Sequence, residues 1–106
     1  MSEGLLGGNV RALGLASFTF NPASVASATS AEQTVTVPGA RVGDFVFLSK
    51  PTATAGVGIV NARVSATNTV AVTFVNATAG AIDPASETYK ILWVRASGNL
   101  PGAIGD

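Results

Sequence analysis

The sequence predicts an all-β protein, an antiparallel β-sandwich of the jelly-roll or immunoglobulin-like kind. Apolar and polar residues alternate along several segments, turn-forming residues recur about every ten positions, and no segment has the apolar spacing of a helix. The alternation is clearest in residues 57–65 and 69–76, which flank the short polar turn Ala66-Thr67-Asn68. This pattern predicts a hairpin of two antiparallel strands, each with one buried face. Its expected buried residues are Val60, Ala62, Val64, Val70, Val72 and Phe74.

Three shorter segments ahead of this hairpin are also predicted as strands. They cover residues 18–20, 33–37 and 45–48. The first two end at Asn21-Pro22 and Pro38-Gly39, because proline has no N–H to donate to a strand ladder. Residues 23–31 are small and predict a loop. The third segment is an apolar run without alternation, which predicts a strand with little exposure.

The last predicted strand covers residues 87–95 and is apolar on both sides. One face carries Tyr89, Ile91 and Trp93, and the other carries Thr88, Lys90, Leu92 and Val94. Apolar residues on both faces predict a central strand of a sheet, or a strand beneath a subunit contact. Tyr89 and Trp93 are predicted as core residues rather than as a platform for sugars, because both lie inside an apolar strand.

The 106 residues predict one domain whose ends differ in composition from its middle. We expect an N-terminal arm over residues 1–15, a sandwich over residues 16–96 and a flexible C-terminal tail over residues 97–106. The arm is rich in glycine, which opposes an isolated helix, yet its apolar residues could become ordered against a partner. A frayed terminus and a further strand of the domain are the alternatives. The arm residues expected to contact a partner or another subunit are Leu5, Leu6, Val10 and Leu13.

The composition argues against several kinds of partner. Six basic and six acidic residues give a formal charge of zero, without the basic surplus that nucleic-acid binding requires. No stretch approaches the ~20 apolar residues of a membrane span, and the first residues lack the features of a signal peptide. Only 11% of the residues are charged and 47% are hydrophobic. This shortage of charge predicts buried subunit contacts or docking on a larger assembly, with a monomer covered by Ser, Thr and Asn as the alternative.

Residues that commonly carry catalysis are scarce. The chain contains no Cys and no His, which removes thiolate nucleophiles, thiolate metal sites and the usual neutral-pH base. Ser49 and Lys50 are adjacent, so on a strand their side chains point to opposite faces. Gly56-Val57-Gly58 lacks the remainder of a phosphate-binding loop. The sequence therefore predicts a non-enzymatic protein with no catalytic, metal-binding or cofactor-binding residues.

The charged residues are scattered along the chain. The carboxylates are Glu3, Glu32, Asp44, Asp83, Glu87 and Asp106, at the chain ends, turns and strand starts. The four arginines form no basic patch in the sequence. Arg63 lies on the expected polar face of the hairpin, where it could contact a neighbouring subunit.

Three blocks of the sequence, taken in order, resemble a known family. They are residues 34–46 (TVTVPGARVGDFV), 54–70 (TAGVGIVNARVSATNTV) and 74–89 (FVNATAGAIDPASETY). These blocks are similar to those of small all-β structural proteins of tailed bacteriophages, and the likeness extends over residues 17–95. Because the blocks consist of strand and turn residues, they specify a fold more strongly than an activity.

The resemblance implies a virion structural protein, most like a head-decoration or capsid cement protein. Such a protein sits on the outer capsid surface, commonly as a trimer, after synthesis in the bacterial host cytoplasm. Its implied partners are the major capsid protein and further copies of itself, with neither nucleic acid nor a membrane among them. A tail, neck or head-fibre component and a carbohydrate- or host-surface-binding module are the alternatives. The family motif supplies no catalytic residues and implies no cofactor.

Overall fold

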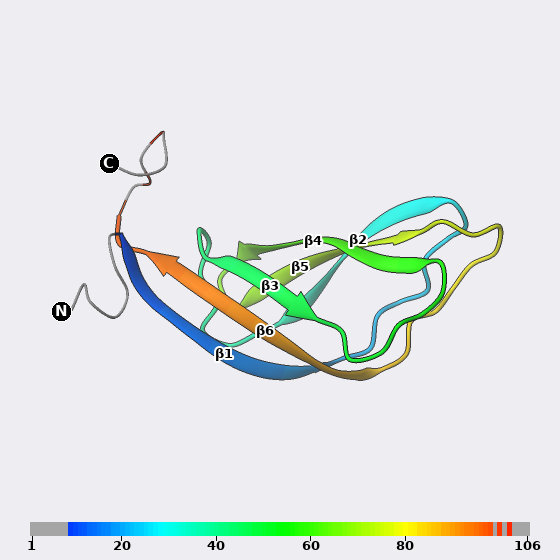
Figure 1. The fold of residues 1–106 in the computed structure, drawn as a ribbon, viewed down its shortest axis with the longest axis horizontal. Coiled ribbons are helices and arrows are strands. Elements are labelled where there is room, and N and C mark those ends of the chain that lie inside the picture. The colour runs from blue at the N-terminus through cyan, green and yellow to red at the C-terminus, as the bar shows by residue number, and fades with distance from the viewer. Residues whose placement is uncertain (1–8, 99, 101, 103–106) are drawn as a thin grey trace.

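The computed structural model describes residues 9–98, 100 and 102, and these residues form six β-strands and no helix (Figure 1). The strands are β1 Val10–Phe20, β2 Thr29–Thr36, β3 Phe45–Ser49, β4 Val57–Ala66, β5 Thr69–Asn76 and β6 Glu87–Ala96. They form two three-stranded antiparallel sheets, in the orders β1-β6-β3 and β2-β5-β4. The predicted all-β antiparallel sandwich is therefore confirmed, as is the central position of the last strand.

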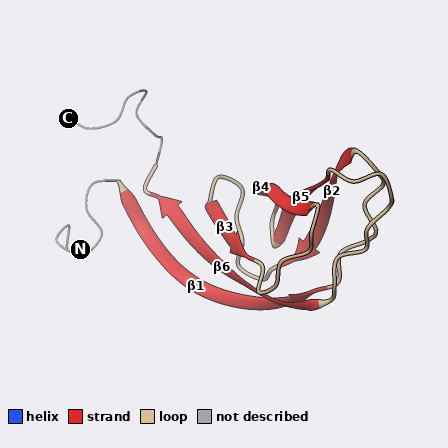
Figure 2. Cartoon of the chain, turned by 45° about the vertical axis from the view of Figure 1, so that its right-hand side comes forward, coloured by secondary structure: helices blue, strands red, loops and turns tan. Residues whose placement is uncertain are grey.

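The sheet β1-β6-β3 extends beyond its partner sheet. Figure 2 shows β1 and β6 as a long curved pair, and the ends of this pair nearest the chain termini project past β2, β4 and β5. The molecule is accordingly elongated, with extents of 50 × 27 × 23 Å. The sheet β2-β5-β4 thus covers only part of the inner side of the longer sheet.

The core lies between the central strands β5 and β6. Val70, Val72 and Phe74 of β5 pack in one cluster with Tyr89 of β6, and all four are fully buried. The ring of Phe20 lies between the aromatic residues of the two sheets, 6.0 Å from Phe74 and 5.4 Å from Tyr89 between centroids. Aromatic pairs at this spacing contribute about 0.5–1.5 kcal/mol beyond their area burial. This aromatic cluster therefore joins the two sheets.

A buried amide holds the long connection between β5 and β6. The side-chain amide of Asn76 donates to the carbonyls of Val25 at 3.0 Å and Gly80 at 2.8 Å. Its carbonyl oxygen accepts from the backbone N–H and the hydroxyl of Thr78 at 2.9 and 2.7 Å. Because every polar atom of this side chain has a partner, the cost of burying it is offset. The connection is thereby fixed against the end of the sandwich.

Strand β1 begins earlier than the sequence predicts. Residues 10–15, expected in the N-terminal arm, pair with β6 in a register that places Gly14 opposite Trp93. This glycine, which argues against ordered structure in an isolated segment, is required for packing: a Cβ there would lie 2.6 Å from Cζ2 of Trp93. The arm prediction is therefore wrong for residues 10–15, while residues 1–8 lie outside the described residues.

Two expectations about burial are also wrong. Val60, expected on the buried face of the hairpin, is 62% exposed, because a register shift between Ile59 and Asn61 turns the strand by one residue. Strand β3, expected to have little exposure, leaves Phe45 50% and Phe47 59% exposed. Its apolar run has one side against the core and the other side uncovered.

The predicted C-terminal tail is described only at residues 97, 98, 100 and 102. Its first residue continues the pairing of the sheet, since the backbone N–H of Ser97 donates to the carbonyl of Asn9 at 2.8 Å. The flexibility of the tail stays a prediction.

Candidate assembly surface

The outer face of the sheet β2-β5-β4 is polar. Its outward positions carry mainly Ser, Thr and Asn, together with an ion pair that crosses β5. Nε of Arg63 lies 2.8 Å from Oε2 of Glu32, and Nη2 lies 2.9 Å from Oε1. These hydrogen bonds lower the pKa of Glu32. Ala71, the register partner of Arg63, is only 1% exposed, and its small side chain lets the pair lie across the strand. Such a face is suited to solvent.

The outer face of the sheet β1-β6-β3 is apolar. Two rows cross its three strands, with Leu13, Val94 and Phe45 in one and Leu15, Leu92 and Phe47 in the next. We call these six residues the outer apolar face. Leu15 is 80% exposed, and Leu13, Phe45 and Phe47 are each at least half exposed.

The outer apolar face is comparable in size with the largest apolar patch of a typical monomeric protein. A fully exposed side chain of this kind presents about 200 Å², so the four most exposed residues together present roughly 500 Å² of apolar surface. The largest apolar patch on a monomeric protein is typically about 300–600 Å² and often functional. The outer apolar face therefore lies in the upper part of that range.

A polar rim bounds the outer apolar face along the strands. Ser17, Lys90 and Ser49 form the next row, and Thr19 and Thr88 form the row after it. Lys90 is exposed and is the single charged residue in these four rows. An apolar centre beside a polar rim is the usual layout of a protein contact surface.

The sequence of these strands fits a sheet that is covered on both sides. On the inner side, Ile91 and Val46 belong to the buried core and Trp93 is partly buried against it. Strands covered on both faces are apolar at successive positions, whereas strands with one solvated face alternate. Strands β3 and β6 are of the first kind, but the described residues cover only the inner face.

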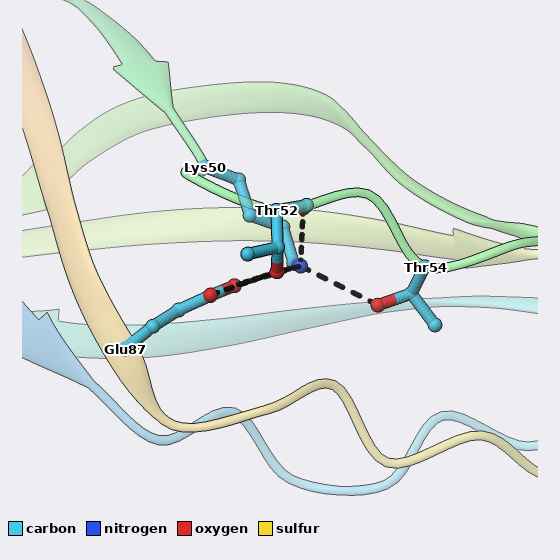
Figure 3. Close-up of polar contacts among 4 residues, drawn as sticks. All are labelled: Lys50, Thr52, Thr54 and Glu87. Atoms are coloured by element: carbon cyan, nitrogen blue, oxygen red, sulfur yellow. Dashed lines mark hydrogen bonds and ion pairs between the residues drawn. The ribbon is translucent and has the colours of Figure 1, made fainter.

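Lys50 directly follows β3, and its side chain is engaged by Glu87 and by threonines, not by the adjacent Ser49. Figure 3 shows Lys50 turned toward Glu87 and the threonines of the following loop. Nζ of Lys50 lies 2.8 Å from Oε2 of Glu87 and donates to the carbonyl of Thr52 at 2.7 Å. Both charged side chains are largely buried, and the hydrogen bond from Lys50 lowers the pKa of Glu87. This network ties the end of β3 to the start of β6.

A third ion pair closes one end of the sandwich beside a cavity of about 280 Å³. Arg95 donates to both carboxylate oxygens of Asp44, at 2.9 and 2.7 Å, and to the carbonyl of Gly39 at 3.1 Å. These bonds hold the loop between β2 and β3 on β6. The guanidinium carbon of Arg95 lies 5.2 Å from the ring centroid of Trp93. Trp93 is partly buried, with Gly14 and Arg95 near its indole, and it lines the same cavity.

The predicted contact residues lie in different places. Leu13 belongs to the outer apolar face, and Val10 pairs with Ala96 at the start of β1. Arg63 lies on the other sheet and is paired with Glu32. Leu5 and Leu6 lie outside the described residues. Among the described residues, the structure thus brings Leu13 to the candidate surface and Val10 to its border, and it places Arg63 elsewhere.

The sequence analysis missed most of the outer apolar face. The signal was present in the two-sided apolar pattern of Leu92 and Val94, for which a subunit contact was one of two interpretations. The apolar run of β3 carries the same signal, although by itself it predicts burial within the domain. Leu15 was assigned to the arm. Only the pairing of three strands shows that these residues share one surface.

No protein-family model matches the chain, and neither a curated protein nor a solved structure matches it. The described residues include no helix that is long and apolar enough to cross a membrane. They also contain no group of three or more Asp, Glu, His or Cys residues placed to hold a metal ion.

Proposed function

We propose that the chain is a non-enzymatic virion structural protein of a tailed bacteriophage. In this proposal it is a decoration protein that binds the outer face of the mature head as a homotrimer and stabilises it. The observation that carries the proposal is the outer apolar face, opposed to the polar outer face of the other sheet. A protein with this asymmetry has one side suited to contact and one side suited to solvent.

The roles of the family-like blocks in the fold support the same proposal. Asp44 in the first block closes its own turn by accepting from the backbone N–H of Arg41 at 3.1 Å. Asn76 and Tyr89 in the third block are buried, the first within the polar network of the loop and the second in the core. These residues build the sandwich, as expected if the blocks encode a structural module.

The engagement of the charged side chains supports a non-enzymatic role. Three ion pairs, Lys50–Glu87, Arg63–Glu32 and Arg95–Asp44, use most of the charged residues that the structure describes. Each pair joins two strands, or a strand and a loop. Groups tied in this way serve the fold rather than acid–base chemistry.

The proposed mechanism is binding alone. A protein that binds the assembled lattice, but not its dissociated subunits, stabilises the lattice by mass action. Many copies, each with a modest contact, together add a large stabilisation to the particle. The partners in this proposal are the major capsid protein and other copies of the chain.

The proposal is tested by counting copies of this protein in purified virions of the parent phage. Quantitative mass spectrometry with isotope-labelled peptides gives its ratio to the major capsid protein. A ratio close to that of the shell protein is expected for a decoration protein. A handful of copies per particle would place it in the tail, neck or fibre and would overturn the proposal.

A further inference from the structure

We propose that the outer apolar face binds a second copy of this chain, so that the sandwich self-associates through the sheet β1-β6-β3. This inference goes beyond the proposed function and does not rest on it, because packing one face against the same face of another copy pairs two molecules rather than three. It assigns the contact between copies to the outer apolar face. Of the six residues of this face, the sequence predicts only Leu13 as a contact residue.

The first support is the geometry of the surface. β-Sheets pack face to face about 10 Å apart, with the side chains of the two faces interdigitating. The two sheets of this chain already pack in that manner around its core. The outer apolar face presents Leu, Val and Phe side chains at alternate positions of three adjacent strands. A second copy presents the same apolar side chains at the same spacing, so the two faces could pack together.

The second support is charge. Lys90, in the polar rim, is the one charged residue in the four outward rows, and those rows contain no carboxylate. The full chain has a formal net charge of zero. Copies without net charge lack the long-range repulsion that keeps molecules apart. A nearly uncharged face also offers little to steer a strongly charged partner, so a surface equally poor in charge suits it best.

The third support is area. A biological interface buries in total more than about 1,000 Å², counted over both partners. The outer apolar face presents roughly 500 Å² per copy, taking about 200 Å² for each fully exposed side chain. Two copies therefore supply about 1,000 Å² of apolar surface, to which the Ser, Thr and Lys rim adds. The apolar surface of two copies thus reaches the lower limit of area for a specific contact.

Lysine substitutions on the face, measured on the full chain, test this inference. Leu15→Lys and Phe47→Lys each place a charge in the outer apolar face, on the edge strands β1 and β3. Both positions are more than half exposed, and a folded monomer tolerates lysine on an edge strand. Thr36→Lys is the matched control, because Thr36 is exposed on β2 in the opposite sheet. Circular dichroism establishes that each variant is folded.

The readout is mass by size-exclusion chromatography with light scattering, from about 1 to 200 µM protein. The unaltered chain is expected at a multiple of 10.5 kDa. Each lysine on the face is expected to raise the dissociation constant at least tenfold, because it leaves a charge without a partner in an apolar contact. The control is expected to keep the mass of the unaltered chain.

Two outcomes overturn the inference. One is an unaltered chain that stays at 10.5 kDa over the whole concentration range. The other is an oligomer that persists in both Leu15→Lys and Phe47→Lys, because the contact would then lie elsewhere.

The failure of this inference and the failure of the proposed function are distinguishable. If the protein is a monomer in solution and many copies occur per virion, this inference fails and the decoration function stands. The outer apolar face would then contact the capsid protein. If the lysine variants dissociate an oligomer, but only a few copies occur per virion, this inference holds and the decoration function is excluded. A face-dependent dimer supports it and removes the homotrimer.

Discussion

At the scale of single residues, the clearest constraint is the contact between Gly14 and Trp93. In a glycine-rich segment, glycine is commonly interpreted as a source of disorder. Here it provides the space that the indole occupies across the β1–β6 pair. The same residue type therefore has opposite meanings in an isolated segment and in a packed strand, and only the partner strand distinguishes them.

We expect Gly14→Ala to lower the free energy of unfolding by about 1–3 kcal/mol, the usual cost of overpacking. The added Cβ would lie 2.6 Å from Cζ2 of the indole, which is partly buried against the core. This cost outweighs the gain of about 0.4–1 kcal/mol from a stiffer unfolded chain. Urea unfolding followed by circular dichroism measures the change.

Gly58→Ala is the matched control, because a Cβ at Gly58 meets nothing within 4 Å. The control is expected to be neutral or slightly stabilising. Equal stability of Gly14→Ala and Gly58→Ala would show that the contact with Trp93 relaxes without cost.

The Arg95–Asp44 pair predicts how stability depends on pH. The hydrogen bond from Arg95 lowers the pKa of Asp44 in the folded state. Ionised Asp44 therefore stabilises the fold above its unfolded pKa of about 3.9, and this stabilisation is lost as the pH falls toward the lower folded-state pKa. We expect Asp44→Asn to be less stable at pH 7 and to lose less stability than the unaltered chain between pH 5 and 2.

Urea unfolding at several pH values between 7 and 2 measures this dependence. Asp83→Asn, at an exposed loop position, is the control and is expected to keep the pH dependence of the unaltered chain. The interpretation fails if Asp44→Asn and the unaltered chain lose stability equally on acidification.

At the scale of elements, β1 decides where the domain begins. The sequence placed the boundary after residue 15, whereas the strand starts at Val10 and pairs with β6 along its length. Two of the six residues of the outer apolar face depend on this pairing, since Leu13 and Leu15 both lie on β1. An element assigned to a docking arm is thus part of the folded sheet.

Two truncations test this boundary. Removal of residues 1–15 is expected to lower the free energy of unfolding by about 3 kcal/mol or more, because it uncovers apolar residues of β6 on both faces. Removal of residues 1–8 leaves β1 whole and is expected to lower the free energy of unfolding by less than removal of residues 1–15. Thermal and urea unfolding measure both. If the two truncated chains are equally stable, residues 10–15 contribute nothing to the sandwich.

At the scale of the whole molecule, the two outer faces are the main feature. Both sheets have three strands and share one core, yet one outer face carries Thr, Ser and an ion pair and the other carries Leu, Val and Phe. A composition with 11% charged residues cannot cover every face with charge, and the structure shows which face lacks it. The low content of charge predicts that some apolar surface is covered by another molecule. The lysine variants test whether the outer apolar face is that surface.

Much of the fold was predictable because local patterns encode it. The β4–β5 hairpin, the two-sided strand β6 and the turns at Pro38-Gly39 and Asn68 were visible as alternation and turn residues. The bulge that exposes Val60 and the early start of β1 were not predictable. The bulge depends on the register that β4 takes with the next strand, β5, and the start of β1 depends on β6, which lies far away in the sequence.

The sequence by itself determined the all-β class, the strand-and-turn pattern, and the lack of Cys and His chemistry. Each of these follows from residue identity and short-range spacing. The tertiary structure decided which apolar residues are covered. Leu15, Phe47 and Leu92 come from three separate segments and become one surface only when β1 and β3 pair with opposite edges of β6. Because burial is a property of neighbours in space, no single segment could specify it.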